Sequence, residues 1–192
     1  MQTRLWRLTK NEEQLNEEKL NEAAALIRAG EVVAFPTETV YGLGANGLDG
    51  NAVRKIFAAK GRPADNPLIL HIAEKSEIEK LTTGLSANAQ ALMQAFWPGP
   101  LTMVVPKSDI IPDEVSAGLD TVAVRMPVHP VARRLIALAG CPIAAPSANK
   151  SGKPSPTNAQ DVLEDMDGLI AGVIDGGSSN IGVESTVVDT TA

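Results

Sequence analysis

The sequence predicts an α/β fold built as a single domain. Segments with helical periodicity alternate along the chain with short apolar segments typical of strands, which is the pattern of α/β proteins. No internal repeat, low-complexity run or linker divides the chain. Its 192 residues, of which 44% are hydrophobic, are enough for one buried core.

The first half of the chain shows this alternation clearly. Apolar residues recur at helical spacing over 12–29, and Gly30 follows where a left-handed C′ residue usually lies. The apolar run 32–35, closed by Pro36, is typical of a strand buried on both faces. Ser76 and Glu79 have capping-box spacing for a short helix. Between Pro36 and Ser76 we expect a loop over 37–50, a helix over 51–60 that ends at Gly61, and a strand over 68–72.

The second half repeats the pattern. A helix over 130–139 is favoured because Pro130 suits a first helical turn and Gly140 suits the position after the last one. Thr157 and Gln160 have the spacing of another capping box. We further expect a helix over 86–96, a rigid loop over 97–100 in which Trp97 packs into the core, a loop over 146–156, and strands over 101–105, 121–126, 143–145, 173–174 and 183–188.

Composition limits the classes of protein to which the chain can belong. Cys141, the only cysteine, cannot form an internal disulfide, and the N-terminus lacks a secretory signal pattern, so we expect a cytoplasmic protein. Every apolar run is shorter than the roughly 20 residues that span a bilayer, and we expect no membrane partner. The formal net charge of -6 disfavours a surface that coats nucleic acid.

Polar loop segments at predicted strand ends form the candidate site. Each combines hydroxyl, amide or cationic side chains with glycine or proline, and ligands of open α/β sheets bind where such loops meet. The sequence therefore predicts a ligand cleft lined by loops. The segments are 36–44 (PTETVYGLG), 60–67 (KGRPADNP), 146–149 (PSAN) and 183–186 (VEST).

The residue types alone leave alternatives open. Lys60 and Arg62 suit a polyphosphate, but they also suit the last carbonyls of a helix. His71 closes an apolar strand and is typical of a hydrogen-bonded core histidine. The hydroxyls of the PTET, PSAN and VEST segments suit turns and strands as well as a site. The sequence contains neither a Walker motif nor a nucleophile elbow, and its histidines and cysteine do not suggest a metal site, so we expect no metal-ligating residues.

Taken together, six motifs resemble those of a known family. The motifs occur in this order over residues 36–189, within a resemblance that covers about 25–189: PTETVYGLG, KGRPADNPL, WPGPLT, TVAVRMP, APSANKSGKPSPT and VESTVVD. They resemble the YrdC/TsaC family of L-threonylcarbamoyladenylate synthases. The resemblance implies a YrdC-like catalytic domain over 1–192 with a twisted mixed sheet flanked by helices. It is greatest to the longer members, which continue after VESTVVD with a further strand, an LRPG-like turn and a second domain; we expect these to be absent from this chain.

The resemblance also implies which residues bind each substrate. The expected threonine-binding residues are Thr39, His71, Arg125, Ala145 and Ser185. The expected ATP-binding residues are Lys60, Arg62, Asn66, Thr121, Ser147, Asn149 and Ser155, of which Lys60 and Arg62 are expected to be catalytic by neutralising phosphates.

The implied reaction condenses L-threonine, bicarbonate and ATP into threonylcarbamoyl-AMP and pyrophosphate, with Mg²⁺ accompanying ATP. The expected partners are these three substrates and, indirectly, a downstream threonylcarbamoyl transferase complex and tRNA. Two alternatives remain: an RNA-binding module of the YrdC type, and a domain that forms a carbamoyl-adenylate.

Overall fold

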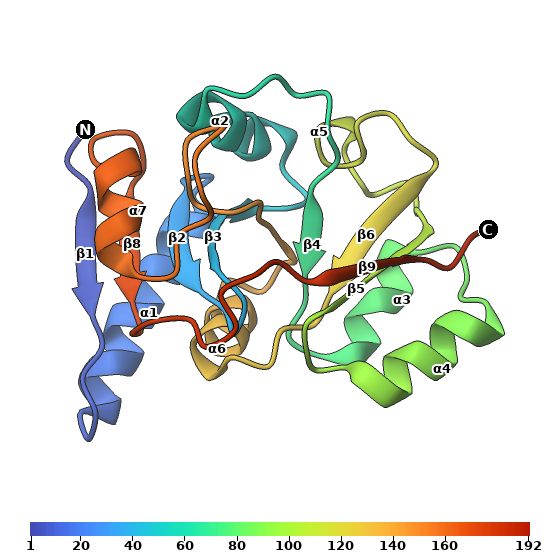
Figure 1. The fold of residues 1–192 in the computed structure, drawn as a ribbon, viewed down its shortest axis with the longest axis horizontal. Coiled ribbons are helices and arrows are strands. Elements are labelled where there is room, and N and C mark those ends of the chain that lie inside the picture. The colour runs from blue at the N-terminus through green and yellow to red at the C-terminus, as the bar shows by residue number, and fades with distance from the viewer.

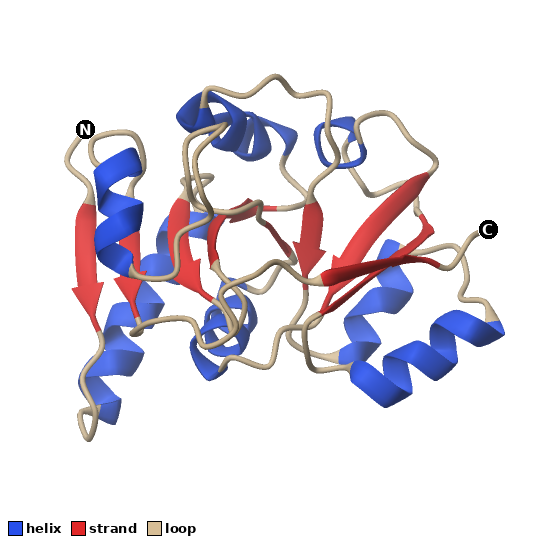
Figure 2. Ribbon diagram, viewed as in Figure 1, coloured by secondary structure: helices blue, strands red, loops and turns tan.

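A computed structural model describes residues 1–192 as one nine-stranded mixed β-sheet with helices on both faces (Figures 1 and 2). The strand order is β1-β8-β2-β3-β7-β4-β6-β5-β9, so the sheet has its edges at the first and last strands of the chain. This confirms the α/β class and the mixed sheet. None of the helices combines the length and the apolar character that a bilayer-spanning segment requires.

The strands are β1 (Arg4–Arg7), β2 (Val33–Pro36), β3 (Tyr41–Asn46), β4 (Ile69–His71), β5 (Leu101–Pro106), β6 (Thr121–Arg125), β7 (Ile143–Ala144), β8 (Gly172–Asp175) and β9 (Thr186–Asp189). The helices are α1 (Glu13–Arg28), α2 (Gly50–Lys60), α3 (Ile78–Leu81), α4 (Ala87–Phe96), α5 (Asp113–Ser116), α6 (Pro130–Ala139) and α7 (Ala159–Met166).

Local sequence signals account for most helix ends. The Asp49 side chain accepts hydrogen bonds from two backbone N–H groups of the first turn of α2, and Gly61 ends that helix in the left-handed conformation. Ser86 caps α4 through the N–H of Ala89. Gly140 adopts the left-handed conformation after α6. These helices therefore begin and end close to where the sequence predicts.

The two faces of the sheet are buried under different helices. Val33 and Phe35 of β2 project into a cluster formed with α1 and α6, whereas Ala34 projects into a larger cluster that includes α2. This alternation follows from the two-residue period of a strand. The prediction of a strand buried on both faces is thus confirmed, since all four residues of β2 are buried. Trp97 is buried as expected, and its indole N–H donates to the carbonyl of Leu101 at 2.8 Å.

The predicted loop over 37–50 is wrong for its middle part, which forms strand β3. The strand was not predicted because it contains Gly42 and Gly44, and glycine has a low β propensity. Packing explains their presence: a Cβ on Gly44 would lie 2.7 Å from Cε1 of Phe35 and 2.8 Å from Cγ2 of Ile143. Glycine therefore allows β3 to pass between two bulky side chains.

Three smaller predictions also differ from the structure, and two short elements were not predicted. The capping box uses Glu74 and Glu77, two residues before the predicted pair, and opens a 3₁₀ turn followed by α3. Helix α7 is capped by Asn158 instead of the Thr157 pair. The last strand begins at Thr186, so 183–185 lie outside it. Strand β1 and the one-turn helix α5 were not predicted, because segments of four residues carry too little periodicity.

Candidate functional site

A polar cavity opens near the middle of the sheet, where β3, β4, β6 and β7 converge. Its floor is formed by Gly42 of β3, Ile69 and His71 of β4, and Arg125 of β6. His71 and Arg125 are register partners in the parallel β4–β6 pair, so their side chains share one face of the sheet. The walls come from three loops, which contribute Thr39, Ala145 with Ser147, and Ser185.

The turn after β2 forms one wall. The Thr37 hydroxyl donates to the carbonyl of Val40 at 2.7 Å and lies 2.9 Å from the Thr39 hydroxyl. The two threonines are almost fully buried, at 2% and 1% exposure. Thr37 therefore stabilises the turn through a local side-chain bond, while Thr39 faces the cavity.

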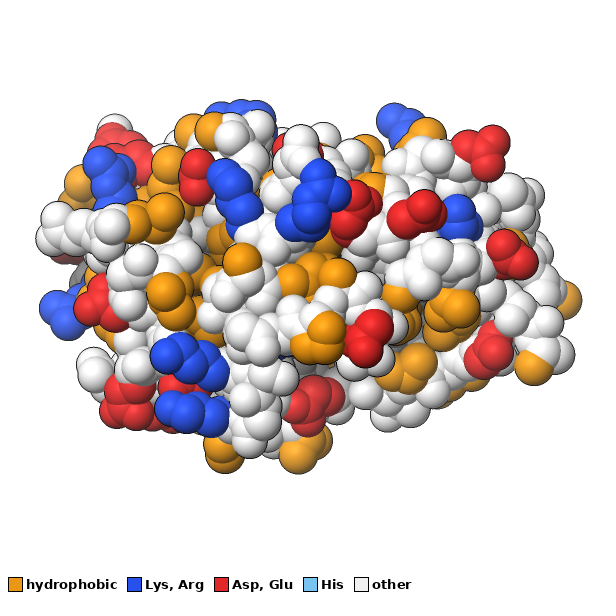
Figure 3. Space-filling view, turned by 90° about the horizontal axis from the view of Figure 1, so that it is seen from above, with side chains coloured by type: hydrophobic (Ala, Val, Ile, Leu, Met, Phe, Trp, Pro, Cys, Tyr) orange, Lys and Arg blue, Asp and Glu red, His pale blue; other side chains and the backbone are white.

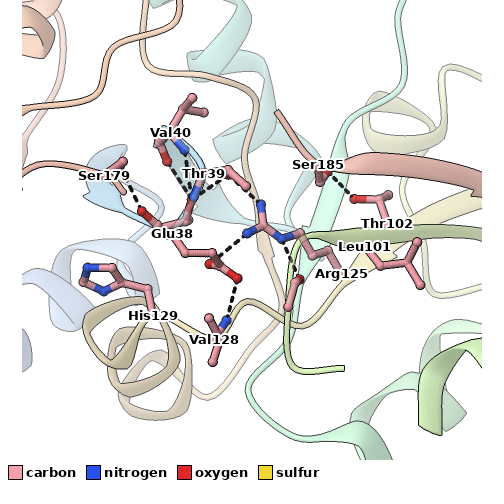
Figure 4. A network of polar contacts seen from close by, with 12 residues as sticks. Glu38, Thr39, Val40, Leu101, Thr102, Arg125, Val128, His129, Ser179 and Ser185 are labelled. Atoms are coloured by element: carbon pink, nitrogen blue, oxygen red, sulfur yellow. Dashed lines mark hydrogen bonds and ion pairs between the residues drawn. The ribbon is translucent and has the colours of Figure 1, made fainter. Parts of the chain in front are cut away.

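Arg125 is the central charge of the site. Its Nη2 lies 2.8 Å from Oε1 of Glu38, its Nη1 donates to the Thr39 hydroxyl at 3.0 Å, and its Nε donates to the carbonyl of Gly99 at 3.2 Å (Figure 4). Burial lowers the pKa of Arg125, and the Glu38 carboxylate partly offsets this effect. Because the guanidinium is always charged in proteins, it offers a fixed fork of donors inside the cavity.

His71 supplies an uncharged polar group. It is 4% exposed, its Nδ1 lies 3.2 Å from the carbonyl oxygen of Ile143, and its ring packs edge-on against Phe35. Burial, together with the charge of Arg125, lowers the pKa of His71 to about 3. The imidazole is therefore neutral at pH 7. This residue is at once the buried histidine that the strand pattern favours and a lining residue of the cavity.

Lys60 ties α2 to the loop that follows β7. Its Nζ donates to the carbonyls of Ser147 and Asn149 at 2.6 and 2.7 Å. Burial, followed by the nearby charge of Arg62, lowers the pKa of Lys60 to about 8. Two of the three ammonium N–H donors thus hold this loop.

The connection between β8 and β9 brings Ser185 to the cavity. Backbone N–H groups of Ile181 and Gly182 donate to the carbonyls of Glu38 and Thr39, at 3.0 and 2.9 Å. Ser185 then lies 2.7 Å, hydroxyl to hydroxyl, from Thr102 of β5. This connecting segment is therefore fastened to the turn after β2 before it reaches β9.

The cavity contains all five residues expected to bind threonine: Thr39, His71, Arg125, Ala145 and Ser185. The residues expected to bind ATP are more spread out. Ser147 lines the cavity, and Lys60 and Asn149 adjoin Ser147 through the contacts above. Ser155 donates to Glu184, another lining residue.

The remaining three expected ATP residues, Arg62, Asn66 and Thr121, do not line this cavity. Asn66 is exposed, in the segment between α2 and β4. Thr121 begins β6, opposite Pro106 of β5. The Arg62 guanidinium lies over the Phe57 ring, 5.7 Å from its centroid, and its Nε is buried without a hydrogen-bond partner.

Two acidic residues of the site carried no role in the sequence analysis. Glu184 lines the cavity, and its pKa lies below the ordinary value because the Ser155 hydroxyl donates to the carboxylate. Glu38 is 7% exposed and pairs with Arg125. An arginine inside the apolar run TVAVRMP was the available signal for Glu38, since a buried arginine requires an acidic partner.

No group of three or more His, Cys, Asp or Glu side chains in the structure is arranged to hold a metal ion. One oxygen nearby suits a hard cation: Oδ1 of Asn149 is buried and has no hydrogen-bond partner, while the amide nitrogen of the same side chain donates to Lys150 and Lys153 carbonyls. Amide and phosphate oxygens together are donors that Mg²⁺ accepts, so the residues present fit a magnesium ion that arrives with a nucleotide.

The chain is similar in sequence to known proteins. The family model Sua5/YciO/YrdC, described as "Telomere recombination", matches residues 25–192. The chain is 60% identical over 179 residues to threonylcarbamoyl-AMP synthase of Pyrococcus abyssi, which covers 93% of this chain and 53% of that protein. It is 57% identical over 190 residues to the Bacillus subtilis protein of the same name, which covers 98% of this chain and 55% of that protein.

A solved structure extends the likeness to three dimensions. The crystal structure of P. abyssi Sua5 complexed with L-threonine superposes with a TM-score of 0.93 at 56% identity, over 100% of this chain and 55% of that one. The chain therefore spans about half the length of the relatives that it matches. With a family model that matches residues 25–192 and relatives at 57–60% identity, the chain belongs to the Sua5/YciO/YrdC family.

Proposed function

We propose that this chain carries the catalytic domain of an L-threonylcarbamoyladenylate synthase. The enzyme would form threonylcarbamoyl-AMP and pyrophosphate from L-threonine, bicarbonate and ATP, for the threonylcarbamoyladenosine modification of tRNA. The observation that carries the proposal is the convergence of Thr39, His71, Arg125, Ala145 and Ser185 on one cavity. The names of the relatives and the threonine complex of the P. abyssi protein support it.

The cavity suits a small zwitterionic substrate that carries a hydroxyl. The Arg125 guanidinium would bind the threonine carboxylate, since arginine donors match carboxylate oxygens in geometry and charge. The hydroxyls of Thr39 and Ser185 and the neutral His71 imidazole would hydrogen-bond the other polar groups. Each of these side chains already projects into the cavity, so binding requires little reorganisation.

The proposed chemistry requires positioning and charge more than a protein nucleophile. The threonine amine and bicarbonate give a carbamate and water; a carbamate oxygen then bonds to the α-phosphorus of ATP while the bond to the pyrophosphate leaving group breaks. Lys60 and Arg62 would neutralise the phosphates as charge moves to the leaving group. Mg²⁺ would contribute further charge neutralisation, held by phosphate oxygens and the Asn149 amide oxygen.

The two alternatives have less support. On the face in Figure 3, lysine and arginine side chains are interspersed with aspartate and glutamate and form no continuous basic stripe, which does not favour an RNA-binding module. No feature of the cavity favours a carbamoyl-adenylate reaction over one that uses threonine. As part of the proposal the reaction takes place in the cytoplasm, where its product would be passed to a threonylcarbamoyl transferase complex acting on tRNA.

Pyrophosphate release tests the proposal directly. We expect release from ATP and Mg²⁺ only when L-threonine and bicarbonate are both present, because the carbamate must form before the α-phosphorus is attacked. ATP consumption at the same rate without threonine would contradict the proposal.

Arg62→Ala should weaken nucleotide binding by about 1–3 kcal/mol, with a smaller effect on threonine binding. Calorimetric titration with each ligand would measure both affinities.

A further inference from the structure

Glu38 is a buried carboxylate with no assigned role at the centre of the site. It lies between two threonines of the turn after β2, at 7% exposure, and it does not line the cavity. One carboxylate oxygen, Oε1, lies 2.8 Å from Nη2 of Arg125. The other, Oε2, accepts the backbone N–H of Val128 at 2.9 Å (Figure 4). Glu38 thus contacts Arg125 without lining the cavity.

This ion pair differs from the others in the protein because it is removed from water on both sides. The side chains of Arg125 and Glu38 are 4% and 9% exposed, whereas each remaining pair has at least one partner that is 49% exposed or more. Loss of either partner of a buried pair is costly, because it leaves the other charge buried without compensation. Glu38 therefore provides the one charged contact of the Arg125 guanidinium, which also donates to the Thr39 hydroxyl and to the Gly99 carbonyl.

Glu38 is itself fixed from two directions. Val128, which holds its side chain, follows β6, the strand that carries Arg125. The backbone carbonyl of Glu38 accepts the N–H of Ile181, in the segment that leads to Ser185. The residue therefore joins the strand that presents Arg125 to the segment that presents Ser185, and so influences both sides of the cavity.

We propose that Glu38 is a positioning residue for threonine recognition. Its carboxylate holds the Arg125 guanidinium in the orientation in which the remaining N–H groups face the substrate carboxylate, and it compensates the arginine charge before substrate binds. This inference rests on the proposed function, because it concerns how the threonine carboxylate is recognised. Glu38 makes no contact with ATP in this scheme, so its effect should be confined to one substrate.

The test compares Glu38→Gln and Glu38→Asp with a matched control, Glu17→Gln. Glu17 also pairs with an arginine, Arg134, but both side chains lie at the surface, 38% and 51% exposed, and neither lines the cavity. Calorimetric titrations with L-threonine alone and with ATP and Mg²⁺ alone would be combined with KM values for both substrates and with thermal unfolding of each variant.

We expect Glu38→Gln to weaken threonine binding about tenfold or more and to leave ATP binding within about twofold, because only the charge that orients Arg125 is lost. Glu38→Asp keeps the charge but is one methylene shorter and should lose affinity for threonine by an intermediate factor. Glu17→Gln should change neither affinity. The KM for threonine should rise while the KM for ATP stays constant, a split that a purely structural role would not produce.

Unchanged threonine affinity in a folded Glu38→Gln protein would overturn the proposal, as would equal losses for threonine and ATP. If Glu38→Gln does not fold, Glu38→Asp decides, because it retains the compensating charge; unchanged threonine affinity in that variant also overturns it. A wild-type protein that binds no threonine would instead contradict the proposed function. The two failures are therefore distinguishable.

Discussion

Replacement of Lys60 by methionine removes one buried ammonium and leaves an unbranched apolar chain of similar length. In the structure this group is 4% exposed and donates at 2.6 and 2.7 Å to the carbonyls of Ser147 and Asn149. Lys60→Met leaves both carbonyls without their ammonium donor, in the loop that carries three of the residues expected to bind ATP.

The expected loss of stability follows from these two bonds. Each charge-assisted hydrogen bond is worth about 1.5 kcal/mol or more, which gives roughly 3 kcal/mol for the pair. Relief of the cost of burying the ammonium, which is also what lowers the pKa of Lys60, offsets part of this. We therefore expect Lys60→Met to lower the free energy of unfolding by about 2 kcal/mol.

Urea unfolding at pH 7 provides the assay, and Lys55→Met provides the control. Lys55 lies on the same helix, but its side chain is 49% exposed and pairs with Glu31 at the surface, so its replacement should change stability by less than about 0.5 kcal/mol. Equal losses in the two variants would refute the reasoning, since the cost would then not come from the buried carbonyls. Pyrophosphate release should fall in Lys60→Met and stay unchanged in Lys55→Met.

Three further predictions follow from other features. The pKa of Lys60 falls from 10.5 to about 8 on folding, so the unfolded chain binds more protons than the folded chain between these pH values. This group should therefore make the free energy of unfolding rise as pH increases from about 8 to 10.5. Urea unfolding over that range should show this rise in wild type and a smaller one in Lys60→Met. Gly44→Ala should destabilise by about 2 kcal/mol because its Cβ would meet Phe35, whereas Gly84→Ala, where a Cβ meets nothing within 4 Å, should stay within about 0.5 kcal/mol. Adenylate formation should reject valine more strongly than serine, because valine leaves the polar partners around Ser185 unpaired whereas serine lacks only a methyl, worth about 1 kcal/mol; equal use of valine and serine would contradict this.

The helices show how far local signals reach. Helix α2 begins after a capping aspartate and ends at Gly61, and both signals involve residues adjacent in sequence. Strand β3 shows the limit. Its glycines weaken every local indication of a strand, and the reason for them, the approach of Phe35 and Ile143, exists only after the sheet has formed. Strand order could not be predicted either, because β8 lies between β1 and β2, which are separated from it by more than 130 residues of chain.

The site divides in the same way. Residue types at strand ends, and the resemblance of six motifs to a known family, were enough to select Thr39, His71, Arg125, Ala145 and Ser185, which converge on one cavity. They assigned nothing to Glu38, and they left Lys60 as either a helix-terminal cation or a phosphate ligand. The contacts from Glu38 to Arg125 and from Lys60 to Ser147 each span 87 positions of sequence, so no local pattern could reveal them.

The sequence by itself determined the α/β class, most helix ends and the side chains available for chemistry, because these depend on periodicity, capping and residue type within a few positions. Only the tertiary structure decided which charges are buried together, which glycines are required by packing, and which loops meet at the cavity. Those properties depend on the distance between residues that are remote in sequence, and burial then sets the strength of each ion pair, hydrogen bond and pKa shift.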